Sequence, residues 1–133
     1  MVHTILLVDD EADFLRVMSV ELKNAGYKVV TAHNGREAVG AYVESLYKGY
    51  HISLIIQDMK LPDLDGIEVL QIIRREEEVR GTEEGRLVPV IMLTGYDRPW
   101  MDPLMIKGCN NYMVKSGSSR ELLEKIGEIL PNK

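Results

Sequence analysis

Two kinds of apolar segment alternate along the chain, and together they predict alternating strands and helices. The first kind is a short uninterrupted apolar run, which is typical of parallel strands covered on both faces. Five such runs occur, at residues 5–8, 28–31, 52–56, 88–93 and 112–114. The second kind spaces apolar residues three and four positions apart, as in an amphipathic helix. Residues 14–25 and 122–130 show this spacing clearly, and residues 35–48 and 66–80 show it less cleanly.

This alternation predicts an α/β fold with right-handed crossovers. The expected architecture is a doubly wound five-stranded parallel sheet with helices on both faces, about five in all. The helix before the last strand should be short or distorted, because Pro99 and Pro103 fall in it and a proline inside a helix costs about 3 kcal/mol. The charged span from Arg74 to Arg86 is interpreted as a helix end that continues into a long solvated connection.

Composition narrows the functions that such a fold can have. The 133 residues are enough for one packed domain, so a single domain is expected over residues 1–133. A formal net charge of −5 disfavours binding to nucleic acid and to anionic membrane surfaces. Cys109 is the only cysteine, which excludes an internal disulfide, and the sequence has neither a cleavable leader nor a long uncharged apolar run. These features predict a soluble, cytoplasmic protein.

Polar side chains directly follow four of the five predicted strands. The strands of a parallel sheet end at one edge, which is where ligands bind in doubly wound folds. The residues that collect there are Asp9, Asp10 and Glu11 after the first run, Asp58 after the third, Thr94 after the fourth and Lys115 after the fifth. Together they make this edge the candidate site.

The acidic residues at this edge require a positive partner. If the first and third strands are neighbours, their ends lie about 5 Å apart, where two carboxylates repel by about 3 kcal/mol at an effective dielectric constant of about 20. Lys115 and a divalent cation can offset this repulsion, and ligands that are all oxygen favour Mg²⁺. A carboxylate beside a metal ion, a lysine and a hydroxyl is equipped to accept a phosphoryl group. Asp58 is the candidate nucleophile because it ends the central strand, whereas Asp9 and Asp10 are placed to hold the metal.

Four short motifs, taken in order, resemble the response-regulator receiver domain of two-component signalling. They are Leu6-Leu7-Val8-Asp9-Asp10-Glu11, then Asp58-Met59-Lys60-Leu61-Pro62 with Asp65-Gly66, then Thr94-Gly95, and finally Tyr112-Met113-Val114-Lys115. The resemblance spans essentially the whole chain. It implies the flavodoxin-like receiver fold with sheet order 2-1-3-4-5, and either a stand-alone regulator or a receiver cut from a longer protein.

The resemblance also implies a phosphorelay function. Asp58 would accept a phosphoryl group from a phosphohistidine on a histidine kinase or a histidine phosphotransfer protein. Mg²⁺ would be held by Asp10, Asp58 and the backbone carbonyl of Lys60, with Asp9 acting through water. Lys115 would pair with the phosphoryl oxygens.

A conformational switch is the remaining implication of the resemblance. The hydroxyl of Thr94 would contact the new phosphoryl group, and Tyr112 would turn inward into the space that this movement vacates. The movement would alter the face formed by the helix before the last strand, the last strand and the last helix. Through this face the domain would control an output protein or domain that the sequence does not identify.

Three further residues lie within or close to the motifs in the sequence. Ser116 follows Lys115 where family members usually carry proline, often after a cis peptide bond, so the geometry of that loop is not predicted. The side chains of Lys60 and Tyr96 lie two positions after Asp58 and Thr94 respectively, and we hypothesise that they flank the phosphoryl group and tune its hydrolysis.

A switch module, whose product is a conformation and not a released metabolite, is not expected to be an enzyme. Three other functions compete with it. A phosphohydrolase with an aspartyl-phosphate intermediate usually has a second aspartate two residues after the nucleophile, where this chain has Lys60. A flavodoxin-like electron carrier needs a hydroxyl-rich phosphate loop after the first strand, where this chain has carboxylates. A degenerate receiver usually lacks metal-binding or nucleophilic residues, and none is missing here.

Overall fold

A five-stranded parallel sheet forms the centre of the molecule. The structure is a computed structural model that describes residues 2–95, 109, 111–115 and 119–131. The strands are β1 (Thr4–Val8), β2 (Lys28–Ala32), β3 (Ile52–Asp58), β4 (Val90–Thr94) and β5 (Asn111–Val114), in the order β2-β1-β3-β4-β5. All four pairings are parallel. The predicted sheet and its order are therefore confirmed.

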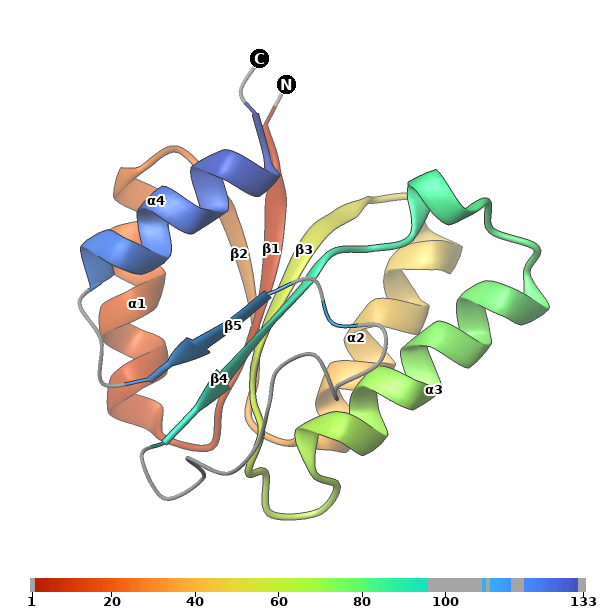
Figure 1. Cartoon of the computed structure of the whole chain (residues 1–133), viewed down its shortest axis with the longest axis horizontal. Coiled ribbons are helices and arrows are strands. Elements are labelled where there is room, and N and C mark those ends of the chain that lie inside the picture. Colours follow the sequence, from red (N-terminus) through yellow and green to blue (C-terminus); the bar gives the residue numbers. More distant parts are fainter. Residues whose placement is uncertain (1, 96–108, 110, 116–118, 132–133) are drawn as a thin grey trace.

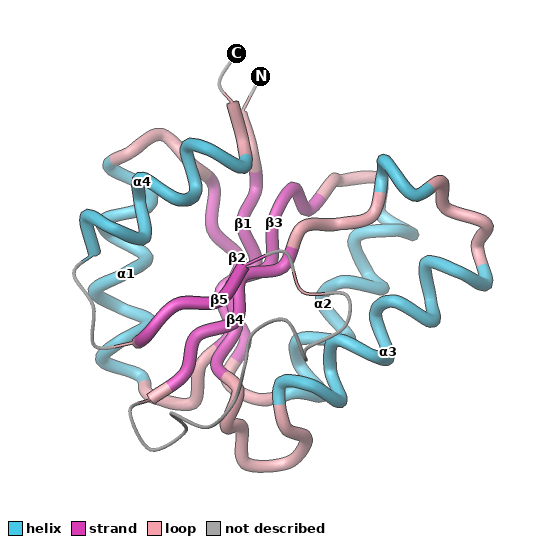
Figure 2. The backbone as a smooth tube through the Cα atoms, in the orientation of Figure 1, coloured by secondary structure: helices cyan, strands magenta, loops and turns pink. Residues whose placement is uncertain are grey.

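Helices cover both faces of this sheet. They are α1 (Ala12–Asn24), α2 (Gly35–Lys48), α3 (Gly66–Val79) and α4 (Ser119–Ile129), with a short 3₁₀ helix at Glu84–Arg86. Helices α1 and α4 lie on one face, and α2 and α3 on the other (Figures 1 and 2). The further helix expected between β4 and β5 falls in residues 96–108, outside the described part of the chain.

Successive side chains of each strand point to opposite faces of the sheet, so the core has two apolar layers. In β1, Leu6 and Val8 pack in the layer that contains the apolar residues of α2 and α3, whereas Ile5 and Leu7 pack in the layer that contains those of α1 and α4. All four side chains are fully buried. This is why the strands have uninterrupted apolar runs instead of alternating apolar and polar residues.

Two strand boundaries differ by two residues from the sequence-based expectation. Strand β3 continues past Ile56 to Asp58, because Gln57 and Asp58 still pair with Met92 and Leu93 of β4. Strand β4 begins at Val90 and not at Val88. The pairing of β3 with β4 places Asp58 within the sheet, at the carboxyl end of its central strand.

The charged span that begins in the last turns of α3 is less solvated than expected. Glu77 is 1% exposed, and one of its carboxylate oxygens accepts hydrogen bonds from the Val88 backbone N–H at 2.7 Å and the Tyr42 hydroxyl at 3.3 Å. Its other oxygen pairs with Arg74 at 2.7 Å. The prediction of a solvated helix end was therefore wrong for Glu77, which fastens the long connection before β4 to the core.

The loop between β3 and α3 is anchored at several points. Asp65 caps α3 in a reciprocal arrangement with Glu68. The Asp63 carboxylate accepts hydrogen bonds from the backbone N–H groups of Gly35 and Arg36 at 2.8 and 3.0 Å, so it binds the first turn of α2. Burial acts to raise the pKa of Asp63, but these bonds outweigh it and lower the pKa below its ordinary value. The loop that follows the candidate phosphoacceptor is thereby held against the neighbouring helix.

Candidate functional site

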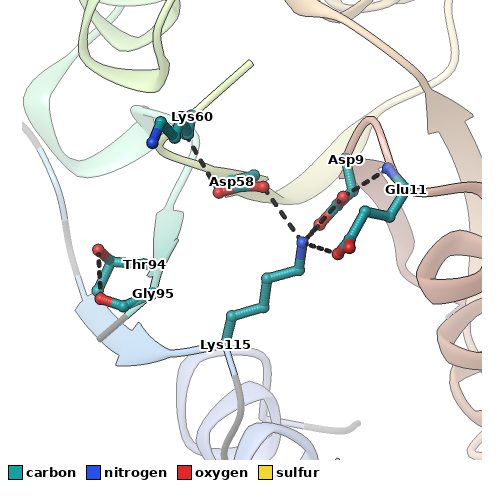
Figure 3. Close-up of polar contacts among 7 residues, drawn as sticks. All are labelled: Asp9, Glu11, Asp58, Lys60, Thr94, Gly95 and Lys115. Carbon is teal, nitrogen blue, oxygen red and sulfur yellow. Dashed lines mark hydrogen bonds and ion pairs between the residues drawn. The ribbon is translucent and has the colours of Figure 1, made fainter. Parts of the chain in front are cut away.

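The polar residues predicted to meet at the strand ends line one cleft. The cleft has a volume of about 540 Å³ and is lined by residues 10–11, 58–62, 94–95 and Lys115. They come from the ends of β1, β3, β4 and β5 and from the loop after β3 (Figure 3). The sheet order explains this arrangement, because β3 lies between β1 and β4 and β5 pairs with β4.

Three carboxylates at this edge form a group that fits a hard divalent cation. Asp9, Asp10 and Asp58 each offer an oxygen, and these atoms all lie within 4.8 Å of one another. Asp9 and Asp58 are buried, and Asp10 is exposed. The Oδ2 atom of Asp9 is buried and accepts no hydrogen bond in the described part of the chain. An all-oxygen donor set of three carboxylates is suited to Mg²⁺.

Lys115 supplies the positive charge opposite these carboxylates. Its Nζ atom lies 2.8 Å from Asp9 Oδ2 and 3.3 Å from Asp58 Oδ2, and it also contacts Glu11 (Figure 3). The contact with Asp9 Oδ2 is an ion pair, and the directed hydrogen bond goes to Asp9 Oδ1 at 3.1 Å. The ring of Phe14 lies 5.1 Å from the ammonium, within cation–π range. The lysine is therefore held among three carboxylates and an aromatic face.

Burial and charge act in opposite directions on the protonation of these groups. Burial raises the pKa of Asp9, and the nearby Asp58 charge adds to this, although Lys115 acts to lower it. Burial acts to lower the pKa of Lys115, but its hydrogen bonds to Asp9 and Glu11 raise it above its ordinary value. Lys115 thus stays cationic at neutral pH, as the neutralisation of the acidic residues requires.

Asp58 presents its carboxylate in the cleft between these groups. Its Oδ1 atom accepts a hydrogen bond from the backbone N–H of Lys60 at 3.2 Å, and its Oδ2 atom faces Lys115. The hydroxyl of Thr94 donates to the carbonyl of Gly95 at 3.3 Å and makes no contact with Asp58 (Figure 3). The residues expected to act on one phosphoryl group therefore share one cleft. In this structure the Thr94 hydroxyl bonds to the backbone of the next residue and not to Asp58.

Tyr112 and Lys115 contact opposite faces of the sheet, because residues three positions apart on extended backbone point to opposite sides. Tyr112 is partly buried and packs against the core layer beside α2 and α3. The ammonium of Lys115 lies by Phe14 of α1, on the other face. Of the remaining predicted site residues, Lys60 is exposed, whereas Tyr96 and the Lys115–Ser116 bond involve residues outside the described part of the chain.

Sequence reasoning assigned no role to three residues that support this cleft, although it placed Glu11 at this edge of the sheet. Glu11 binds the ammonium of Lys115, and Asp63 anchors the loop after Asp58 to α2. Gln57 lies beside Asp58 in β3 and is completely buried. A polar residue that interrupts an apolar strand next to the candidate nucleophile was a signal for Gln57. For Asp63 no comparable signal exists, because its partners are backbone groups distant in sequence.

Comparisons with known proteins agree on one family. A sequence profile of the response regulator receiver domain matches residues 5–127. A probable transcriptional regulator, ycf27 of Cyanidium caldarium, is 35% identical over 130 residues, which cover 96% of this chain and 46% of the relative. The chain spans about half the length of the curated relatives that it matches.

Solved structures extend this agreement to three dimensions. The Thermotoga maritima response regulator TrrA, solved in complex with Mg²⁺-BeF, is 31% identical with a TM-score of 0.75, over 96% of this chain and 99% of that one. The receiver domain of Saccharomyces cerevisiae Ssk1, solved with the histidine phosphotransfer protein Ypd1, is 29% identical with a TM-score of 0.80, over 96% and 88% of the two chains. The chain belongs to the response regulator receiver domain family.

Among the described residues, every helix is too short or too polar to cross a bilayer.

Proposed function

We propose that this domain accepts a phosphoryl group on Asp58 from a phosphohistidine, in a reaction that depends on Mg²⁺. One observation carries the proposal. The Asp58 carboxylate lies in an open cleft with two further aspartates close by and the ammonium of Lys115 at 3.3 Å from its Oδ2 atom. This places a carboxylate nucleophile among the charges that phosphoryl transfer requires.

Each residue of the cleft has its own role in the proposed transfer. An oxygen of Asp58 forms the new bond to phosphorus while the bond between phosphorus and the histidine nitrogen breaks, and the histidine leaves with the electron pair. Asp10, Asp58 and the backbone carbonyl of Lys60 would hold Mg²⁺, with Asp9 acting through water. The ion would neutralise charge on the transferred group. Lys115 would turn from Asp9 and Glu11 to the phosphoryl oxygens.

The proposed switch uses the two residues that border the cleft on β4 and β5. The Thr94 hydroxyl exchanges its weak bond to the Gly95 carbonyl for a phosphoryl oxygen, and Tyr112 then packs deeper toward the vacated space. A hydrogen bond to a charged group contributes about 1.5–3 kcal/mol, which is enough to shift a two-state equilibrium at least tenfold. The Lys60 and Tyr96 side chains would tune hydrolysis by controlling access of water.

The partners follow from the same chemistry. A histidine kinase or histidine phosphotransfer protein would supply the phosphoryl group, and the complex of Ssk1 with Ypd1 supports the second of these. Several relatives are described as transcriptional regulators and are about twice as long, so an output segment would carry any DNA binding. The net charge of −5 supports the prediction that this segment does not bind nucleic acid. A cytoplasmic location stays a prediction.

Incubation with a small phosphodonor tests the proposed reaction. Purified protein is mixed with acetyl phosphate, with and without Mg²⁺, and its intact mass is measured. We expect one phosphoryl adduct that requires Mg²⁺ and is absent from Asp58→Ala. Asp13→Asn is the matched control, because Asp13 is an exposed carboxylate of α1 outside the cleft, and it should form the adduct normally. An adduct on Asp58→Ala, or none on the wild type, contradicts the proposal.

Fluorescence tests the switch separately. Trp100 is the only tryptophan, and it falls in the segment between β4 and β5. Formation of the adduct should change its emission in the wild type. The change should be smaller in Thr94→Ala at equal phosphorylation, and an equal change in both proteins argues against the role proposed for Thr94.

A further inference from the structure

Gln57 is a buried polar residue that the proposed reaction does not use. It is completely buried in β3, directly before the candidate phosphoacceptor. Its Nε2 atom donates to the carbonyl of Gly66 at 2.8 Å and contacts the Met92 sulfur at 3.7 Å. It therefore links the end of β3 to the first residue of α3.

This contact closes the loop that follows Asp58. The backbone N–H of Gly66 donates to the carbonyl of Met59 at 2.7 Å, and the N–H of Met59 donates to the carbonyl of Leu93 at 2.9 Å. Gly66 also packs directly on the strand, because a Cβ atom at this position would lie 2.6 Å from the carbonyl oxygen of Asp58. The loop over residues 59–65 thus leaves and rejoins the sheet at one point, where Gln57 fastens its second end.

The amide of Gln57 makes this link at a cost to the stability of the fold. Its Oε1 atom is buried and accepts no hydrogen bond within the described part of the chain. An unsatisfied buried polar atom destabilises a fold by more than one ordinary hydrogen bond stabilises it. The carbonyl of Gly66 also lies in the first turn of α3, where the helix itself provides a donor. Fold stability alone therefore does not account for a glutamine here.

We propose that Gln57 is a positioning residue for the Mg²⁺ site. Its buried side-chain amide fixes the loop that presents the Lys60 carbonyl beside Asp58, at some cost to the stability of the fold. The inference rests on the proposed function, because it assigns to Gln57 the task of orienting one of the proposed metal ligands. It predicts that removal of the amide weakens metal binding without lowering stability, whereas removal of a purely structural group would lower both.

Gln57→Met tests this directly. Methionine is close to glutamine in length and shape, and it removes both the Nε2 donor and the unsatisfied oxygen. We expect the metal-free variant to melt at the same temperature as the wild type or higher. Its Kd for Mg²⁺, measured by calorimetric titration with Mg²⁺ alone, should rise about tenfold, the lower end of the effects seen when residues behind metal ligands are changed. Amide exchange should also quicken at residues 59–65.

Gln71→Met is the matched control, because Gln71 is exposed on α3 and the same chemical change there should alter neither quantity. Gln57→Leu is a second apolar variant with the same expected result. An unchanged Kd in Gln57→Met, or a weaker Kd together with a lower melting temperature, overturns the inference. Failure of both Gln57 variants to fold also overturns it, since the amide would then be needed for the fold itself.

The two proposals fail in distinguishable ways. A wild-type protein that does not bind Mg²⁺ overturns the proposed function and this inference together. A wild type that binds Mg²⁺ and forms the Asp58 adduct, alongside a Gln57→Met variant that binds equally well, overturns the inference alone.

Discussion

Removal of the Glu77 carboxylate should destabilise the domain strongly without affecting its chemistry. Glu77 is 1% exposed, and it satisfies the Val88 N–H, the Tyr42 hydroxyl and the Arg74 guanidinium. Glu77→Ala leaves all three without this partner. The network lies near the start of β4, whereas the cleft lies at the carboxyl ends of the strands, so adduct formation at low temperature should be unchanged.

The size of the loss follows from the individual contacts. Removing one partner of a buried ion pair costs about 3–5 kcal/mol. Two features place Glu77→Ala near the lower end of this range. Arg74 is 18% exposed and can recover some hydration, and the Tyr42 bond is long at 3.3 Å. The Val88 N–H is buried, and its loss of an acceptor accounts for about 1–3 kcal/mol. Glu77→Gln keeps an acceptor for Val88 and should cost about 1–2 kcal/mol.

Urea denaturation followed by circular dichroism measures these changes. The free energy of unfolding should fall by about 3 kcal/mol in Glu77→Ala with an unchanged slope against urea. Glu78→Ala is the control, because Glu78 is the next residue of α3 and is exposed, so its loss should change stability by less than about 0.5 kcal/mol. A loss below about 1 kcal/mol in Glu77→Ala would refute the view that Glu77 fastens the connection.

Three further predictions concern the loop, the network and the metal. Asp63→Ala should lower the free energy of unfolding by about 1–2 kcal/mol in urea melts, because two backbone N–H groups in the first turn of α2 lose their acceptor, and Asp63→Asn should recover part of this; equal losses would argue against this role of Asp63. Burial, with the Glu77 charge adding to it, raises the pKa of Tyr42 from 10.0 to about 12, so the neutral form is favoured in the fold. Stability should therefore fall between about pH 10 and 12, and alkaline denaturation should show a shallower fall in Tyr42→Phe; identical slopes would contradict this. Mg²⁺ at about a hundred times its Kd should stabilise the wild type by about 3 kcal/mol in thermal melts, and Asp10→Asn should lose most of this; equal stabilisation would exclude Asp10 as a ligand.

The fold was predictable because its signals are local and repeated. Each strand is an apolar run, and each helix has an apolar stripe, so alternation alone indicated the doubly wound class. The residues after the strands then identified the cleft, because parallel strands end together. Asp9, Asp58, Thr94 and Lys115 were all placed correctly at this edge by that argument.

The parts that sequence reasoning missed depend on contacts across the fold. Glu77 stands in a run of charges and looks solvated, and only packing shows that Val88 and Tyr42 surround it. Asp63 is a common turn residue, and its partners are backbone groups of α2. Gln57 ended the expected apolar run one residue after Ile56, although the strand continues through it. In each case the partners of the polar side chain are distant in sequence, so the local pattern does not identify them.

Locating the phosphoryl group tests the central claim most directly. Wild-type protein is treated with acetyl phosphate and Mg²⁺, the acyl phosphate is trapped by borohydride reduction, and the modified residue is identified by fragment mass spectrometry. The account predicts modification of Asp58 alone. Modification of Asp9, Asp10 or Asp63 instead, or an unmodified Asp58 in protein that binds Mg²⁺, would contradict it.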